Sequence, residues 1–305
     1  MPTPLRGTQS LVNQMGWVFS RPSLTTFEIA WRWIFGIPFL AVCWVQAQKI
    51  LAALTPESAG LSSVDPQNPW VAATQLAHTW ALYQPRVDAV FRWLAPIAAL
   101  AWVVLSGLGR SLVLRQIDPI PANRLPFRPL PMIALQAVWL VLMGATFWGW
   151  FRLVGWVAAT HITSGGEPDL IGFSIWLIFL SLGLFTAWAL VSWPLAIAPI
   201  LMLAENRSAL SSLGQSLKLG KVFTGKLVEI NLVMGIVKLA VMVLAMVFSA
   251  APLPFSDQLG GDALHIVWAA SIVFFFVAND YFQVVRLKSS LQFWRTFREG
   301  KPATQ

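Results

Sequence analysis

The stretch Leu170–Ala204, LIGFSIWLIFLSLGLFTAWALVSWPLAIAPILMLA, contains no charged residue and decides the fold class. A helix needs about 20 apolar residues to cross a bilayer, and this stretch exceeds that length. In the whole chain of 305 residues, 57% are hydrophobic and 11% are charged. Soluble domains carry about 25% charged residues. The chain has too few charged residues to cover a water-facing surface, and we predict an integral membrane protein.

Six apolar stretches in the chain reach the length of a transmembrane helix. We expect a helix in each, because an open sheet leaves backbone groups without hydrogen bonds in lipid and no strand alternation is visible. The predicted fold class is therefore all-α, an integral membrane bundle of six transmembrane helices with interfacial amphipathic helices. The expected spans are Ala30–Leu54, Ala89–Gly107, Pro131–Val157, Leu170–Ala204, Val228–Ala251 and Leu264–Val285.

The fourth of these stretches is too long for one straight crossing. It contains Pro194 and Pro199 near its end. Each proline removes a backbone donor from the helix, so we expect a kink or a break near Trp193.

Two further segments have the apolar spacing of short helices that lie on a membrane surface. Leu11, Met15 and Val18 predict one such helix before the first span, on the inner face. The residues that predict the other, in the loop after the first span, are Trp70, Val71, Leu76, Trp80 and Leu82. We expect three parts in the chain, namely a cytoplasmic N-terminal segment with its interfacial helix (1–29), a six-span membrane domain (30–288) and a basic cytoplasmic tail (289–305).

Lys and Arg residues are distributed unequally between the loops. The net charge is +8, and most of the 21 Lys and Arg residues fall in the N-terminal segment, the tail and the two loops on the same side. Because Lys and Arg are retained in the cytoplasm, both termini are predicted to be cytoplasmic. The acidic residues of the opposite loops are Glu57, Asp65, Asp88, Glu167, Asp169, Asp257 and Asp262. The basic side is expected to contact an anionic inner leaflet, and no nucleic-acid partner is expected.

Two charged residues fall inside predicted spans. Lys238 lies near the middle of the fifth span, where a charge costs about 2.5–3.5 kcal/mol, and Asp280 lies near the cytoplasmic end of the sixth. Counted from the loop that joins these spans, the two residues differ in depth by about four residues, or roughly 6 Å. We predict an ion pair, direct or through water, which either locks two helices or lines an ion or substrate pathway. A lysine that snorkels to the inner surface is the remaining alternative. The polar neighbours that would join a pathway are Asn231, Asn279 and Gln283.

A second group of polar residues follows the fourth span at its inner end. An acid and an amide come directly after the apolar run, and Leu210, Leu213 and Leu217 then recur at helical spacing with serines mostly opposite. This pattern predicts an amphipathic helix in the inner interface, closed by two lysines near lipid phosphates. It serves either as a connector or as a docking or regulatory helix. The cytoplasmic interface cluster consists of Glu205, Asn206, Lys218 and Lys221.

The same segment resembles bacterial multi-pass families grouped around the glycerophosphodiester phosphodiesterase membrane domain and the Yip-like domain. The matching residues are Pro199, Glu205, Ala209, Leu210, Ser216, Leu217, Leu219 and Lys221. Gln215 stands where these families usually carry a basic residue. The resemblance implies a membrane module in a bacterial inner membrane and not the hydrolase, whose catalytic part is a separate soluble domain.

No motif in the chain predicts catalysis, a metal or a cofactor. His78, His161 and His265 fall in three separate outer loops without ligand spacing, so we interpret them as interfacial histidines. The chain has one cysteine, Cys43, and no nucleophile elbow or phosphate-binding loop. Most of the 17 tryptophans fall near span ends, as in an aromatic belt. We therefore expect no metal, no cofactor and no catalytic residue.

The sequence predicts a multi-pass membrane protein that is not an enzyme and that organises lipid or anchors a partner. The alternative is a transporter or permease for a small solute or lipid, which would use Lys238 and Asp280. A third hypothesis, a lipid-modifying enzyme, requires Glu205 to face a lateral cleft at headgroup depth. The expected partners are membrane lipids of an anionic inner leaflet and a protein partner or second copy of the chain.

Overall fold

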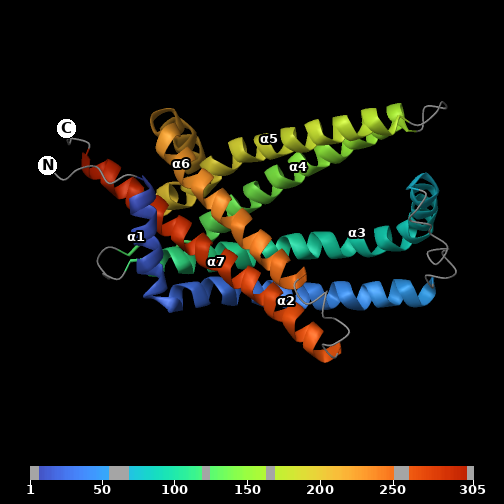
Figure 1. Ribbon diagram of the computed structural model, residues 1–305. Helices are drawn as coiled ribbons and strands as arrows, with labels where there is room; N and C mark the ends of the chain where they lie inside the picture. The colour runs from blue at the N-terminus through green and yellow to red at the C-terminus, as the bar shows by residue number, and fades with distance from the viewer. Residues whose placement is uncertain (1–6, 55–68, 119–123, 163–168, 251–260, 301–305) are drawn as a thin grey trace. The chain divides into compact units, whose positions relative to one another are not determined.

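The described part of the chain is mostly helical and contains no strand. The computed structural model describes residues 7–54, 69–118, 124–162, 169–250 and 261–300 (Figure 1). The elements are α1 (Gly7–Phe19), α2 (Pro22–Ala53), α3 (Pro69–Gln116), α4 (Pro129–His161), α5 (Leu170–Ala204), α6 (Ala209–Ala250) and α7 (Gly261–Gly300). The predicted all-α fold class is confirmed.

Five helical segments in the described residues are long and apolar enough to cross a membrane. They are Pro22–Ala53, His78–Gln116, Pro129–His161, Leu170–Trp188 and Asp262–Gln292. The predicted fifth span falls within α6, where the described apolar segment Val233–Ser249 is shorter than these five. The helices therefore have the character of a membrane protein, and the count of six crossings stays a prediction.

The chain divides into two compact units. One unit is Ala30–Ser106, which contains most of α2 and α3. The other combines Met1–Ile29 with Gly107–Gln305, and it contains α1, the ends of α2 and α3, and all of α4 to α7. All the residues of the candidate site described below belong to this larger unit.

The smaller unit exposes apolar side chains from both of its helices. Leu40 and Trp44 on α2, and Phe91 and Leu100 on α3, are exposed. Its helices are joined at one end by a hydrogen bond of 2.8 Å that the Tyr83 hydroxyl donates to the carbonyl oxygen of Leu54. Apolar surface of this kind is stable where lipid, rather than water, surrounds the helices.

In the larger unit, α4, α5, α6 and α7 pack in chain order, and α1 packs against α7 and α6. Trp139 of α4 meets Trp188 of α5 edge to face, with ring centroids 5.6 Å apart. The indole of Trp268 at the start of α7 donates a hydrogen bond of 3.0 Å to the carbonyl oxygen of Ser249 on α6. Successive helices are therefore held together by aromatic side chains as well as by apolar packing.

Helix α5 continues through both of its prolines, so the predicted break is not found, while the predicted kink stays a prediction. Its two parts lie in different surroundings. Ile171 and Phe185 in the first part are exposed, whereas every residue from Ile200 to Leu203 in the last turn is buried. The beginning of α5 therefore presents an apolar surface, and its end forms part of the core.

Two predicted interfacial helices join directly to spans. Helix α3 begins at Pro69, so the predicted short helix and the second span form one helix, whose first turns in Figure 1 lie across the direction of its remainder. Helix α6 begins at Ala209 and continues into the predicted fifth span. The helices continue although Pro85 lies within α3 and Gly220 within α6.

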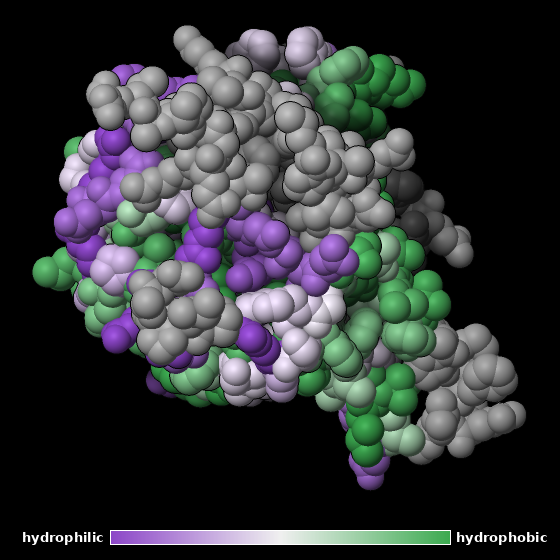
Figure 2. Space-filling model, turned by 90° about the vertical axis from the view of Figure 1, so that its left-hand side faces the viewer, coloured by the Kyte–Doolittle hydropathy of each residue, from purple (hydrophilic) through white to green (hydrophobic). Residues whose placement is uncertain are grey.

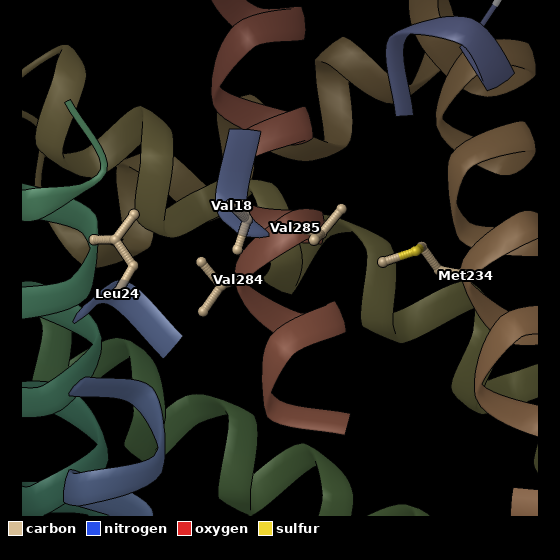
Figure 3. Close-up of a cluster of buried hydrophobic side chains, with 5 residues drawn as sticks. All are labelled: Val18, Leu24, Met234, Val284 and Val285. Atoms are coloured by element: carbon tan, nitrogen blue, oxygen red, sulfur yellow. The ribbon is translucent and has the colours of Figure 1, made fainter. Parts of the chain in front are cut away.

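A cluster of buried apolar side chains fixes α1 and the start of α2 against the C-terminal helices. Figure 3 shows Val18 of α1 beside Val284 of α7, with Leu24 of α2 on one side and Met234 of α6 reaching toward Val285 on the other. Each of these side chains is almost entirely removed from solvent. The short helix α1 is thus a packed part of the larger unit.

Candidate functional site

Helix α1 is held on α7 by polar contacts as well as by the buried cluster. The Tyr281 hydroxyl of α7 donates a hydrogen bond of 2.8 Å to the backbone carbonyl of Met15. The side-chain amide of Gln14 donates to the side-chain oxygen of Gln292, which lies farther along α7 than Tyr281. These bonds fix the position of the residues that follow them on α1, beginning with Trp17.

Two cationic side chains lie against the ring of Trp17. The guanidinium carbon of Arg21 is 4.3 Å from the ring centroid, and the Lys288 ammonium is 4.1 Å from it. Both distances are within the range of cation–π attraction, which is strongest for tryptophan. The indole therefore brings together two charges of the same sign, one from the turn after α1 and one from α7.

A buried carboxylate lies beside these cations. Asp118, the second residue after α3, is 4% exposed and forms an ion pair with Arg295 of α7. The Arg124 side chain donates a hydrogen bond of 3.4 Å to the backbone carbonyl of Asp118. Lys288 lies within electrostatic range of Asp118, Arg295 and Arg21. We call this group the Trp17 cluster; its members are Trp17, Arg21, Asp118, Arg124, Lys288 and Arg295.

The Trp17 cluster combines four cations with one carboxylate. Its cationic residues are partly or fully exposed, while Asp118 is buried among them. Figure 2 views the molecule from the side on which α1 lies in Figure 1, and hydrophilic residues gather on this face. The excess of positive charge makes this end of the larger unit suited to bind an anion.

Two members of the predicted cytoplasmic interface cluster, Glu205 and Asn206, directly follow α5, and the other two belong to α6. Asn206 has a positive φ of 55°, and the backbone N–H of Arg207 donates to the carbonyl of Met202 at 3.1 Å, so the segment is a left-handed helix cap. Glu205 pairs with Arg207 at 2.6 Å, and Arg128 donates a hydrogen bond of 3.3 Å to the Arg207 carbonyl. Glu205 is therefore held in a structural contact. Lys218 is exposed on α6, and the side chain of Lys221 lies outside the described residues.

The first turns of α6, which follow this cap, are amphipathic. They turn their serines, and not their leucines, toward the rest of the protein. Leu210 and Leu217 are exposed, whereas Ser212 and Ser216 are buried. Each of these serines donates to a carbonyl of its own helix, Ser212 to Ala209 at 2.7 Å and Ser216 to Leu213 at 2.6 Å. The serines can therefore pack against the protein without an unpaired hydroxyl, and the leucines remain available to lipid.

The structure leaves the predicted intramembrane ion pair untested. Asp280 on α7 is 2% exposed, and α7 packs against α6, which carries Lys238. The side chains of Lys238 and Asn231 lie outside the described residues. Gln283 is partly buried on α7.

Two adjoining hollows lie between α6 and α7. Asn279 is the polar residue of the first, which has a volume of about 250 Å³ and shares Met242 and Phe275 with the second, of about 230 Å³. The other lining residues of the first are Gly235, Leu239, Val241 and Phe282. The second hollow contains Ser249 and Ser271, whose hydroxyls donate to carbonyls of their own helices. Neither hollow is lined by Asp280, and both present mainly apolar surface.

One of the three histidines lies at a helix cap. The carboxylate of Asp169 accepts a hydrogen bond of 2.8 Å from the backbone N–H of Gly172 and lies 3.1 Å from the His161 ring. Asp169 is thus the N-cap of α5. In the described residues no group of three His, Cys, Asp or Glu side chains gathers in a way that could hold a metal.

This cap predicts a pH dependence at the start of α5. The hydrogen bond from the Gly172 N–H, and then the one from the His161 ring, holds the pKa of Asp169 below its ordinary value of 3.8. Because the folded-state pKa is the lower one, the cap stabilises α5 above pH 3.8 and loses this effect as the pH falls through the folded-state value. We expect the hydrogen-exchange protection of the Gly172 amide, corrected for its intrinsic rate, to fall in acid.

The variant Asp169→Ala provides the control for this prediction. It should show the reduced protection at every pH, with no additional loss in acid, because it has no carboxylate to titrate. Equal protection in the two proteins near neutral pH would contradict the proposed cap.

No member of the Trp17 cluster was predicted from the sequence as a site residue. Trp17 and Arg21 are four positions apart, and Lys288 and Arg295 are seven apart on one helix, so each pair had a visible spacing. Asp118 gave no such signal, because its partner Arg295 is distant in the sequence. Glu28, an acid buried at the start of α2, was also not singled out.

A comparison of the chain with protein-family models, with curated proteins and with solved structures finds no match in any of the three.

Proposed function

We propose that this chain is a non-enzymatic membrane module of a bacterial inner membrane that organises lipid or anchors a partner, with both termini in the cytoplasm. The observation that carries the proposal is the Trp17 cluster, which combines four cations with one carboxylate at one end of a unit whose helices expose apolar side chains. Apolar helices with an adjoining basic face suit a bilayer that has anionic headgroups.

Further support comes from the surroundings of the polar residues that a transporter or an enzyme would use. The hollows between α6 and α7 are mainly apolar, and Asp280 lines neither of them. Glu205, the candidate base for a lipid-modifying enzyme, is paired with Arg207. The carboxylate of Glu205 is thus engaged by a side chain of the protein itself, and this contact disfavours the enzymatic alternative.

The experiment reconstitutes the full chain in vesicles that contain phosphatidylcholine and about one fifth phosphatidylglycerol. After extraction with a polymer that retains the surrounding lipids, phosphatidylglycerol should be enriched around the protein relative to the bulk membrane. An unchanged lipid composition would contradict the lipid-organising role. Uptake of ions and small solutes should equal that of empty vesicles.

One observation favours the transporter alternative. Asn279, next to the buried Asp280, lines the larger hollow between α6 and α7. Solute uptake by the wild-type chain that disappears in Lys238→Ala, with the folding of the variant intact, would establish this alternative and contradict the non-transporting module.

A further inference from the structure

We infer that the Trp17 cluster is a binding site for the phosphate of an anionic phospholipid headgroup. The inference rests on the lipid-organising role proposed above, and it names the lipid class and the residues that bind it. The cluster supplies three properties that such a site needs, namely uncompensated positive charge, cations fixed in position, and a location at a membrane surface.

The first property is the charge of the cluster. Asp118 is the carboxylate of the cluster, and Arg295 already pairs with it. Arg21 and Lys288 both lie against the Trp17 ring, and Lys288 is attracted by Asp118 but repelled by Arg295 and Arg21. The four cations of the cluster thus exceed its one carboxylate, and an anion bound beside them weakens their repulsion and forms charge-assisted hydrogen bonds with the cations that it contacts.

The second property is the spacing of these two cations. Both are measured from the same ring centroid, 4.3 Å for Arg21 and 4.1 Å for Lys288, so both charges adjoin one indole. A phosphate group bound at the edge of this ring is near both cations, and its oxygens bond N–H donors at about 2.8 Å.

The packing of α1 keeps this arrangement in place before any anion binds. Val18, next to Trp17, is buried against α7, and the Tyr281 hydroxyl bonds the backbone of Met15 at 2.8 Å. Lys288 and Arg295 are carried by the same helix, α7. Binding sites whose cations are already fixed lose less entropy when the ligand arrives.

The third property is the apolar surface next to the cluster. Phe19, two residues before Arg21, is 80% exposed, and Val12 on α1 and Phe27 on α2 are also exposed. Apolar side chains beside basic ones are typical of helices that enter the headgroup region of a membrane. Tryptophan is also favoured at headgroup depth, so Trp17 suits the same location. A lipid phosphate, rather than a free anion, is therefore the ligand that this surface fits.

The test measures lipid retention by the purified full chain in detergent. Phosphatidylglycerol, phosphatidylcholine or inorganic phosphate is titrated in, and bound lipid is counted by native mass spectrometry. The wild-type chain should retain phosphatidylglycerol in preference to phosphatidylcholine, and this preference should weaken as salt is added. Each of Arg21→Gln and Lys288→Gln should weaken phosphatidylglycerol binding by about fivefold, and the double variant by more than tenfold.

Two further variants separate binding from folding. The exchange Arg21→Lys with Lys288→Arg keeps both charges and should retain most of the binding. Arg152→Gln is the matched control, because Arg152 lies 5.3 Å from the Trp148 ring in a similar cation–π contact on α4 but outside the cluster. It should leave phosphatidylglycerol binding unchanged.

The outcomes distinguish this inference from the proposed function. Enrichment of phosphatidylglycerol around the chain that survives Arg21→Gln with Lys288→Gln would overturn the site and leave the lipid-organising role intact. Inorganic phosphate at millimolar concentration that displaces phosphatidylglycerol completely would show a site for a free anion and overturn the lipid assignment. Loss of binding in Arg152→Gln equal to that in the double variant would overturn the role of the cluster.

Discussion

Replacing Arg295 with alanine is expected to lower the free energy of unfolding by about 2–3 kcal/mol. The reason is that Asp118, 4% exposed, would remain buried without the guanidinium with which it forms an ion pair. Removing one partner of a fully buried pair costs about 3–5 kcal/mol. The effect should be smaller here because the Arg295 side chain is 29% exposed and Lys288 lies nearby. Unfolding of the chain in detergent, followed by tryptophan fluorescence, measures the change.

Arg207→Ala is the matched control for this loss. Arg207 forms an ion pair with Glu205, but both of these side chains are more exposed than Asp118, so the expected cost is at most about 1 kcal/mol. The double variant Asp118→Asn with Arg295→Met should recover part of the stability that Arg295→Ala loses, because it leaves no buried charge unpaired. Equal stability of Arg295→Ala and the wild-type chain would contradict the buried pair.

The apolar helices are the part of the fold that follows most directly from sequence. A run such as Leu170–Ala204 has one stable conformation in lipid, since only a helix satisfies its backbone groups internally. Four predicted spans, Ala30–Leu54, Ala89–Gly107, Pro131–Val157 and Leu264–Val285, lie almost entirely within segments that have the length and composition to cross a membrane. Local hydropathy and helix geometry decide these features, and neither depends on distant residues.

The boundaries of the helices were less predictable. The sequence suggested separate interfacial helices before the second and fifth spans, whereas α3 and α6 each run on without interruption. Pro85 and Pro96 did not end α3. In lipid, a proline inside a helix removes one backbone hydrogen bond, whereas a chain that leaves the helix loses the hydrogen bonds of a whole turn, which costs more free energy. The orientation of the α6 serines also depended on the neighbouring helices, since Ser212 and Ser216 pack inward.

The candidate site was the least predictable part. Asp118 and Arg295 are distant in the sequence, and no local pattern connects them. Trp17 fits an aromatic belt equally well when it is viewed alone, and only its contacts with Arg21 and Lys288 give it a second role. Sites that are assembled from several helices depend on tertiary packing, which a single sequence does not reveal.

Gly107→Leu is expected to have the second large effect, a loss of several kcal/mol in the free energy of unfolding, and Gly107→Ala a smaller loss of about 1–3 kcal/mol. A Cβ atom at Gly107 would lie 2.5 Å from the Ile133 side chain and 2.8 Å and 2.9 Å from its Cα and N atoms. Because the Ile133 backbone cannot rotate away, α3 and α4 would have to separate where a small residue now lets them approach closely.

Gly144→Ala and Gly149→Ala on α4 are the matched controls, because a Cβ atom at either position would meet nothing within 4 Å. Alanine is a better helix former than glycine by up to about 1 kcal/mol, so these variants should be neutral or slightly stabilised. The free energy of unfolding should therefore fall in Gly107→Ala and stay equal or rise in the two control variants. This difference separates the effect of steric contact from that of helix propensity. A gain of stability in Gly107→Ala similar to that of the controls would contradict the close approach of α3 and α4, since propensity alone would then account for all three variants.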